Sequence, residues 1–306
     1  MKSFIQVPTP LQYLEKVSEY LRTPVWIKRE DLFSYYSASG SKARKLAKIL
    51  PLLEKESVTD IITAGTTGSH HVNATAKIAK TFDFKVHAIF LKQPYLDYSY
   101  AIYQNTCSLV QDISFSINEL SLAFRALYLY HKLKREGKRP YFLFPGGTNA
   151  GGISAYVEAG LELLQQPVPV DYQVCIYGSG GITAGLQLAR QLEPSLPPIF
   201  SVQVYPGFWN GKLYIRNLAG LSQVKYGITS YGDTDLSISS SYIGKAYGTE
   251  NESCKEAIEI FQKDKIQLDP IYMARAGQAI IDLARKKNNA KGLLLWYTSP
   301  AFNSLY

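Results

Sequence analysis

Short apolar runs alternate with longer amphipathic stretches along most of this chain. The apolar runs have the length of strands, and we expect strands at residues 58–64, 85–91, 140–144, 173–177, 199–204 and 292–297. Between them, apolar residues recur every three or four positions, which predicts helices at 70–82, 117–135, 152–165, 182–192, 252–264 and 274–287. An earlier strand is expected at 25–31, and a further amphipathic helix after residue 45.

Strands separated by helices of this length favour parallel, doubly wound sheets in an α/β fold. Ligands on such sheets lie at the carboxyl ends of the strands, in the loops that open the next helix. With 306 residues, the chain is long enough for two lobes, each with a sizeable core. The strand-to-helix loops are therefore the first places to look for a site.

The charge balance points to a small anionic ligand. The chain carries a net charge of +8, and its basic residues are mostly scattered. The densest basic cluster lies at 132–139, where a predicted helix ends, and cations are favoured at a helix C-terminus. No nucleic-acid-binding motif accompanies this cluster, so we expect no nucleic-acid partner.

The cysteines and the apolar runs indicate the cellular compartment. Cys107, Cys175 and Cys254 lie far apart, and an odd, scattered set argues against a disulfide framework. The N-terminal stretch lacks the apolar core of a signal peptide, and no run approaches the ~18 apolar residues of a membrane span. We therefore expect a cytoplasmic protein with no membrane partner.

Lys42 is the first candidate for chemistry. It follows two small residues, Gly40 and Ser41, between the strand expected at 25–31 and the next helix. Small residues allow another backbone or a flat ligand to approach closely. A lysine buried here beside cations such as Arg44 and Lys45 has a lowered pKa, which frees its amine for Schiff-base chemistry. The alternative is a solvated lysine in the first turn of a helix.

Residues 178–186, GSGGITAGL, follow an apolar strand and open a helix. Their glycines permit a tight turn with several N–H groups on one side, and the helix N-terminus adds partial positive charge. Together these features favour phosphate binding. Neither the dinucleotide-binding spacing nor the Walker A spacing is present. A turn that is required only for packing is the alternative.

Two further loops join predicted strands to helices. Residues 64–73 contain Ser69, which is suited to cap the following helix, and the adjacent His70 and His71. Neighbouring residues do not share one helix face, and no third ligand lies at metal-binding spacing, so we expect no metal. Residues 144–152 suit either a hinge between lobes or a turn that contacts a ligand.

Taken together, these residues resemble the fold-type II pyridoxal-phosphate enzymes, specifically the D-cysteine desulfhydrase and 1-aminocyclopropane-1-carboxylate (ACC) deaminase family. The matching elements occur in the family's order and span nearly the whole chain. They are residues 28–31 (KRED), 39–46 (SGSKARKL), 68–71 (GSHH), 146–149 (GGTN), 178–186 (GSGGITAGL), 244–248 (GKAYG), 269–272 (DPIY) and 297–300 (YTSP).

The resemblance implies a two-lobed α/β fold of the tryptophan synthase β type, with doubly wound, mostly parallel sheets. Residues 47–149 would form the small lobe, and residues 1–46 with 150–306 the large lobe that binds the cofactor. The implied cofactor is pyridoxal 5′-phosphate, and the implied substrate is a small amino acid.

The family's residue roles carry over position by position. Lys42 would bind the cofactor covalently and then move the substrate proton. The phosphate would be held by Lys45 and by loop residues Ser179, Gly180, Gly181 and Ile182. The residues implied to border the substrate and take part in catalysis are Ser69, Tyr247 and Tyr272. His70 and Thr298 would contact the cofactor ring.

Three positions depart from the family pattern. His70 stands where the family has the asparagine that touches the cofactor's phenolic oxygen, and Ser41 replaces the asparagine before the lysine. Met273 stands where the deaminases have a glutamate facing the pyridine nitrogen, and a thioether is only a weak acceptor. Thr298 or Ser299 is then the expected neutral partner. A weaker electron sink disfavours opening of the ACC ring and leaves a simpler β-elimination.

The resemblance thus implies a homodimeric lyase or deaminase. It would convert a small, D-cysteine-like amino acid to a keto acid and ammonia by α,β-elimination. The departures at His70 and Met273 leave two alternatives open. One is β-replacement or racemisation on the same scaffold, and the other is cofactor binding without catalysis.

Overall fold

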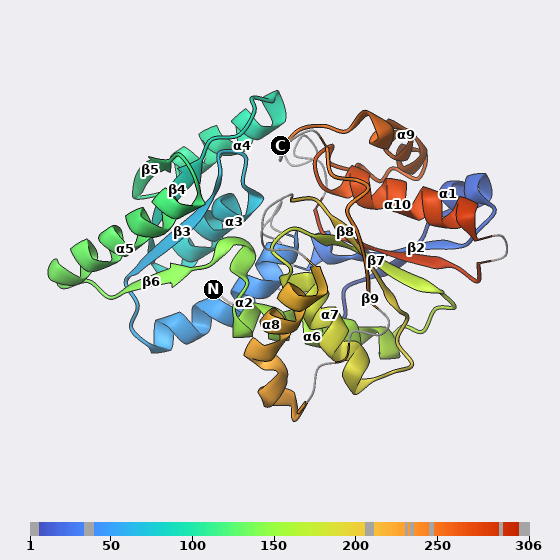
Figure 1. Cartoon of the computed structure of the whole chain (residues 1–306), viewed down its shortest axis with the longest axis horizontal. Helices are drawn as coiled ribbons and strands as arrows, with labels where there is room; N and C mark the ends of the chain where they lie inside the picture. Colours follow the sequence, from blue (N-terminus) through green and yellow to red (C-terminus); the bar gives the residue numbers. More distant parts are fainter. Residues whose placement is uncertain are drawn as a thin grey trace.

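The computed structural model describes residues 6–33, 40–205, 211–229, 232, 236–244, 248–287 and 290–299. Its strands form two sheets that lie side by side (Figure 1). The larger sheet has the order β1 (Leu11–Tyr13), β2 (Val25–Arg29), β10 (Leu293–Tyr297), β7 (Tyr172–Tyr177), β8 (Ile199–Gln203) and β9 (Leu236–Ser239). The smaller sheet has the order β5 (Asp112–Ser116), β4 (Lys85–Leu91), β3 (Asp60–Thr66) and β6 (Pro140–Leu143). Among these strands, β1 and β2 pair antiparallel and all other neighbours pair parallel.

Helices cover both faces of the larger sheet. One face carries α1 (Glu15–Leu21), α9 (Lys255–Gln262) and α10 (Met273–Lys286), and the other carries α6 (Ala150–Leu161), α7 (Gly181–Leu192) and α8 (Gly211–Gln223). Along β10, Leu293 and Leu295 belong to the core under α10, whereas Leu294 and Trp296 belong to the core under α6 and α7. A strand that is buried on both faces has a continuous run of apolar residues, and this run is why β10 could be predicted from the sequence.

The smaller sheet is covered more lightly. One face carries α5 (Glu119–Arg135), and the other carries α2 (Gly40–Lys55) and α3 (His70–Ala79), with α4 (Asp97–Cys107) beside α3. Helix α2 also packs against α6 of the larger sheet. It therefore connects the two layers, and its first turn lies where they meet (Figure 1).

The structure confirms the predicted fold class. The strand predicted at 85–91 coincides with β4, and most other predicted elements differ by a few residues at their ends. The strand predicted at 25–31 ends at Arg29, because the 3₁₀ turn η1 (Glu30–Leu32) follows it. The helices predicted at 70–82 and 152–165 end in the 3₁₀ turns η2 (Lys80–Phe82) and η4 (Glu162–Gln165).

Several elements are present that the apolar pattern does not predict: β1, β5, β9, α1, α4 and α8. The helix expected after residue 45 begins earlier, at Gly40, so Lys42 lies inside its first turn. Within the described parts of the chain, no helix combines the length and apolar character that crossing a membrane requires.

Candidate cofactor and catalytic site

The start of α2 is fixed against the end of β10. The backbone N–H of Ser41 donates a hydrogen bond to the carbonyl oxygen of Thr298 at 3.0 Å. Gly40 has a φ of +39°, and a Cβ added there would lie only 1.6 Å from the same oxygen. Only glycine fits this junction, because any side chain would collide with the backbone of Thr298. This close contact fixes the backbone position from which the Lys42 side chain extends.

The amine of Lys42 is buried, and its Nζ atom donates to the hydroxyl of Ser41 at 2.9 Å. Burial lowers the pKa of Lys42 to about 8, and the negative charge of Asp269 opposes this shift only in part. Roughly a tenth of the Lys42 side chains are then neutral at pH 7. Lys42 is thus a nucleophile that is available near physiological pH.

Arg44 does not lower the pKa of Lys42, contrary to the expectation from the sequence. Its guanidinium binds Glu30 through Nε at 2.8 Å and Glu162 through Nη1 at 2.6 Å. Lys28 pairs with Glu162 at 3.0 Å, so two cations and two carboxylates balance in this buried cluster. The cluster ties α2 to the end of β2 and to η4, and its charges compensate one another instead of acting on Lys42.

Lys45 lies one turn further along α2 and reaches the loop after β7. Its Nζ donates to the carbonyl oxygen of Gly146 at 3.0 Å. A Cβ added to Gly181 would lie 2.8 Å from this Nζ and 3.1 Å from the hydroxyl of Thr148. The Thr148 hydroxyl donates to Ser179 Oγ at 2.7 Å. Residues from α2, from the turn after β6 and from the loop after β7 therefore converge on one point.

The charge of Lys45 is not compensated by a carboxylate among the described residues. Burial, together with the nearby positive charge of Lys42, lowers the pKa of Lys45 well below its ordinary value. The point also faces the start of α7, whose first N–H groups have no acceptor within the helix. Two buried lysines and a helix N-terminus favour an anion, so the residues present fit the phosphate of pyridoxal phosphate.

The two loop glycines have different tasks. Gly180 has a φ of +80°, and a Cβ there would meet Leu218 at 2.8 Å and Ile215 at 3.0 Å, both on α8. Gly180 is thus required for the turn and for packing against α8. Gly181 is the glycine that leaves room beside Lys45. Ile182, in the first turn of α7, is buried in the core on that face.

His70 is the first residue of α3, close enough to Lys42 to feel its charge. Its Nε2 lies 2.5 Å from the phenolic oxygen of Tyr98, on α4. Burial and the charges of Lys42 and Lys77 lower the pKa of His70 to about 3, so the ring is neutral. The ring of Tyr272 meets His70 edge-on, with centroids 5.8 Å apart. Tyr98 is a site residue that the sequence did not indicate.

The two adjacent histidines point to different partners. His71 Nε2 lies 2.9 Å from the hydroxyl of Thr63, which itself donates to the carbonyl oxygen of Leu143. The Thr63 hydroxyl has one proton, so His71 must donate to it through Nε2. His71 therefore supports the sheet beneath the site, while His70 faces the site itself.

Asp269 fixes the start of α10. Its carboxylate accepts hydrogen bonds from the N–H groups of Ile271, Tyr272 and Met273 at 2.7–3.1 Å. Burial raises the pKa of Asp269 to about 6, although these hydrogen bonds oppose the rise. This cap sets the backbone of Tyr272, whose ring faces His70.

Met273 and Thr298 lie together beneath the start of α2. The hydroxyl of Thr298 donates to the sulfur of Met273 at 3.4 Å, and both side chains are buried. Sulfur is a weak acceptor, so this hydroxyl can turn to a stronger one when a ligand offers it. Thr298 remains our expected neutral partner for the pyridine nitrogen.

Ser69 is the N-cap of α3. Its Oγ accepts a hydrogen bond from the N–H of Val72 at 3.3 Å, which leaves the hydroxyl proton for another acceptor. Capping and chemistry are therefore compatible at this residue. Tyr247, the remaining residue expected to border the substrate, lies outside the described residues. The roles of Ser69, Tyr247 and Tyr272 in catalysis remain predictions.

Comparisons with known proteins agree with this geometry. The family model described as "Pyridoxal-phosphate dependent enzyme" matches residues 2–296. The chain is similar to a D-cysteine desulfhydrase of Salmonella typhimurium, with 28% identity over 99% of this chain and 94% of the relative. A desulfhydrase of Salmonella typhi is also 28% identical, with the same coverage of both chains.

Solved structures show the same fold. An ACC deaminase homologue superimposes with a TM-score of 0.84 and 27% identity, over 96% of this chain and 90% of that one. A serine racemase from Dictyostelium discoideum gives 0.65 with 14% identity, over 96% and 92%, and shows the fold alone. The family match covers nearly all of the chain, and the buried lysines and the loop before α7 suit the cofactor that defines the family. The chain therefore belongs to the pyridoxal-phosphate-dependent enzymes.

Proposed function

We propose that the protein catalyses α,β-elimination of a small amino acid, with D-cysteine as the first candidate. The observation that carries the proposal is the placement of Lys42. This amine has a pKa near 8, and its charge acts both on Lys45, which points to the turn after β6, and on His70, which lies beside Tyr98. The relatives named D-cysteine desulfhydrase and the solved ACC deaminase homologue support this reaction class.

The proposed residue roles follow from position and charge. Bound pyridoxal phosphate supplies the electron sink that makes the α-proton of an amino acid acidic. Lys45, Gly181 and the first N–H groups of α7 would hold the phosphate. Lys42 would attach the cofactor and, once released by the substrate, take the α-proton. Neutral His70 would contact the cofactor ring on the side away from the phosphate.

Ser69, Tyr247 and Tyr272 would border the substrate and move protons at its α- and β-substituents. In the proposed reaction of D-cysteine, the Cα–H and Cβ–S bonds break, and the sulfur leaves as sulfide with a proton. The resulting enamine is hydrolysed by water to pyruvate and ammonia. If Met273 and Thr298 face the pyridine nitrogen, they would offer it no carboxylate, and the weaker electron sink would suit this elimination better than the opening of a strained ring.

We also propose the organisation of the enzyme. The small lobe would comprise residues 47–149, and its first boundary falls within α2, which packs against both layers. The enzyme would act in the cytoplasm, in keeping with its scattered free thiols. It would work as a homodimer.

Assay of the cofactor-loaded protein on the D- and L-forms of cysteine, serine and alanine, and on ACC, tests the proposal. We expect sulfide and pyruvate in equal amounts from D-cysteine and little turnover of ACC. Chiral chromatography of recovered alanine and serine detects racemisation, and addition of a second thiol detects β-replacement. If only racemisation or only β-replacement is detected, that reaction would replace elimination as the proposed function. No turnover of any member would overturn the proposal in favour of cofactor binding alone.

A further inference from the structure

Ser41 connects the amine of Lys42 to a buried tyrosine. Its hydroxyl accepts a hydrogen bond from Lys42 Nζ at 2.9 Å, while its backbone N–H is held by the carbonyl oxygen of Thr298. The same hydroxyl is a hydrogen-bond partner of the Tyr156 phenol, on α6, and both side chains are buried. Ser41 therefore links the reactive end of α2 to a polar group on a neighbouring helix.

Tyr156 in turn binds a buried carboxylate. Its hydroxyl donates to Glu30 Oε2 at 3.1 Å. Glu30 also accepts from Arg44 Nε at 2.8 Å, from Arg44 Nη2 at 2.9 Å and from the hydroxyl of Thr9 at 2.8 Å. Burial and the negative charge of Glu30 raise the pKa of Tyr156 well above its ordinary value, so the phenol keeps its proton. Tyr156 is thus a fixed donor to a fixed acceptor.

The number of protons sets the direction of each bond in the series Ser41–Tyr156–Glu30. Tyr156 has one hydroxyl proton and gives it to Glu30, so its bond with Ser41 must be donated by Ser41. The effect on the phenol agrees, because Ser41 lowers the pKa of Tyr156, as a donor does. The single proton of Ser41 is then in use. Toward Lys42 its oxygen can act only as an acceptor.

An oxygen that only accepts leaves the amine of Lys42 reactive. A neutral amine has two protons and one lone pair, and the lone pair is what attacks a carbonyl carbon. Ser41 accepts from one N–H of this amine, so the lone pair remains on another side of Nζ. A serine with an uncommitted proton could instead donate to the lone pair and block it.

We propose that Tyr156 and Glu30 hold the hydroxyl of Ser41 as an acceptor, so that the lone pair of Lys42 is free to attack the cofactor. Ser41 touches the reacting nitrogen, whereas Tyr156 and Glu30 are positioning residues that act through it. Arg44 contributes by fixing Glu30 and not by its charge. This role rests on the proposed function, in which Lys42 takes up pyridoxal phosphate.

Capture of pyridoxal phosphate by cofactor-free protein measures the reactivity of Lys42. The lone pair of Nζ forms a C–N bond to the aldehyde carbon, and the aldehyde oxygen leaves as water with the two amine protons. In the pH profile of the rate, the midpoint reports the pKa of Lys42 and the plateau at high pH reports the reactivity of its neutral amine. The described charged or titratable groups that interact with Lys42 stay in place in the variants below; they are Asp269, Lys45, His70 and His71.

Tyr156→Phe removes the acceptor of the Ser41 proton. The ring remains, with its contacts to Trp296 and Lys45, and the other partners of Glu30 are untouched, so folding should be preserved. Ser41 can then donate to the neutral amine, which favours the neutral form and blocks its lone pair. We expect the midpoint to move about one pH unit lower and the plateau rate to fall about tenfold.

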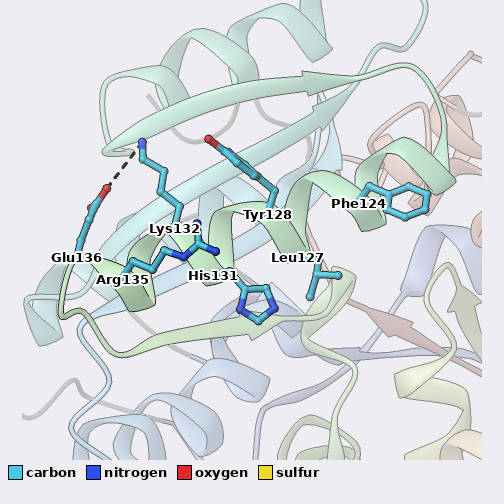
Figure 2. A pocket seen from close by; sticks show the side chains of 7 residues that line it. All are labelled: Phe124, Leu127, Tyr128, His131, Lys132, Arg135 and Glu136. Atoms are coloured by element: carbon cyan, nitrogen blue, oxygen red, sulfur yellow. Dashed lines mark ion pairs between the residues drawn. The ribbon is translucent and has the colours of Figure 1, made fainter.

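The double variant Ser41→Ala/Tyr156→Phe tests whether the two hydroxyls act together. Without the Ser41 hydroxyl no proton can turn to the amine, so adding Tyr156→Phe to Ser41→Ala should change neither the midpoint nor the plateau. Tyr128→Phe is the matched control. Tyr128 lines a shallow pocket on the exposed side of α5 (Figure 2), across the smaller sheet from α2, and its change should leave the profile unaltered.

Borohydride reduction followed by mass spectrometry identifies the lysine that carries the adduct. An adduct on another lysine would overturn the role of Lys42 and, with it, that of the series Ser41–Tyr156–Glu30. With the adduct on Lys42, an unchanged or faster plateau in Tyr156→Phe would overturn the role of the series alone. So would an equal effect of Tyr156→Phe with and without the Ser41 hydroxyl, or an equal effect of Tyr128→Phe.

Discussion

The phenolic oxygen of Tyr98 and the Nε2 atom of His70 are 2.5 Å apart, which joins α4 to the first residue of α3. His70 is neutral, because burial and two nearby lysines lower its pKa to about 3. Burial also raises the pKa of Tyr98 well above its ordinary value, so the phenol keeps its proton. The bond therefore fixes the orientation of an uncharged imidazole beside Lys42.

Tyr98→Phe should impair catalysis while the cofactor stays bound. Without its hydroxyl partner, His70 loses its fixed orientation toward the cofactor, and we expect kcat/KM to fall about 10- to 100-fold. The absorbance of bound cofactor should shift as well. Tyr100→Phe, on the exposed side of α4, should change neither property. An unaltered spectrum and rate in Tyr98→Phe would show that the bond only supports packing.

Covalent capture of pyridoxal phosphate by cofactor-free protein should follow the titration of Lys42. Burial lowers the pKa of this lysine from 10.5 to about 8, so the reactive neutral amine increases as the pH rises to 8. We expect the capture rate to rise about tenfold per pH unit below 8 and then to level off. Stopped-flow absorbance measures the rate, and borohydride should trap no adduct in Lys42→Ala. A midpoint near 10.5 would contradict the burial of the free amine.

Lys45→Met should separate cofactor affinity from stability. The change removes a buried charge that no described carboxylate compensates, so we expect the cofactor-free protein to unfold at higher denaturant concentration. Charge-assisted hydrogen bonds contribute roughly 1.5–3 kcal/mol, so cofactor affinity should fall about 10- to 100-fold. Lys48 lies on the same helix as Lys45, and Lys48→Met, which breaks a half-exposed pair with Glu158 of α6, is the matched control. Equal affinity in the two variants would place the phosphate elsewhere.

Gly181→Ala should weaken cofactor binding without unfolding the protein. The added methyl would come within 2.8 Å of Lys45 Nζ, the end of a flexible side chain, which must then move away from the phosphate. Gly180→Val should instead destabilise the fold, because residue 180 has a φ of +80° and faces α8. Gly220→Ala, with open space around its Cβ position, serves as the control. Isothermal titration with pyridoxal phosphate measures the affinity, and normal affinity in Gly181→Ala would show that this corner only packs.

Ser69→Ala and Tyr272→Phe should bind the cofactor normally and lose most turnover. Loss of the N-cap alone costs about 1 kcal/mol of stability, whereas loss of a proton-transfer group lowers the rate by roughly 10²–10⁴. Asn118→Ala removes the N-cap of α5, which lies away from the site, and should reproduce only the stability change. Steady-state kinetics on D-cysteine and thermal unfolding distinguish the two effects. Full activity in both site variants would exclude them from the reaction.

The loop proposed to hold the phosphate could be picked out from the sequence because its residues are contiguous. The glycines of residues 178–186 and the helix that follows them lie within one short segment, so their suitability for an anion can be read from the sequence. Lys42 is flanked by small residues, which indicate that another backbone packs closely there. Tyr98 could not be found in this way. It belongs to α4, whose mixed sequence shows no clear apolar period, and it meets His70 only through the packing of α4 against α3.

The prediction that Arg44 lowers the pKa of Lys42 was wrong. Arg44 and Lys42 are close in sequence, but Arg44 turns toward Glu30 and Glu162, which come from distant segments. In the fold, β5 escaped prediction because most of its residues are exposed and it has no continuous apolar run. A strand that is buried on both faces appears in the sequence as a continuous apolar run. An edge strand such as β5 is partly exposed and has no such run.

The place of β10 in the larger sheet has a consequence for synthesis. This strand comes last along the chain, yet it lies between β2 and β7. While the chain is being made, the smaller sheet has all of its strands early, whereas β2 and β7 have no link until residues 293–297 emerge. The carbonyl of Thr298, which fixes the start of α2, arrives later still. We therefore expect a chain that stops short of this point to lack the contact that fixes the start of α2, and to capture the cofactor poorly.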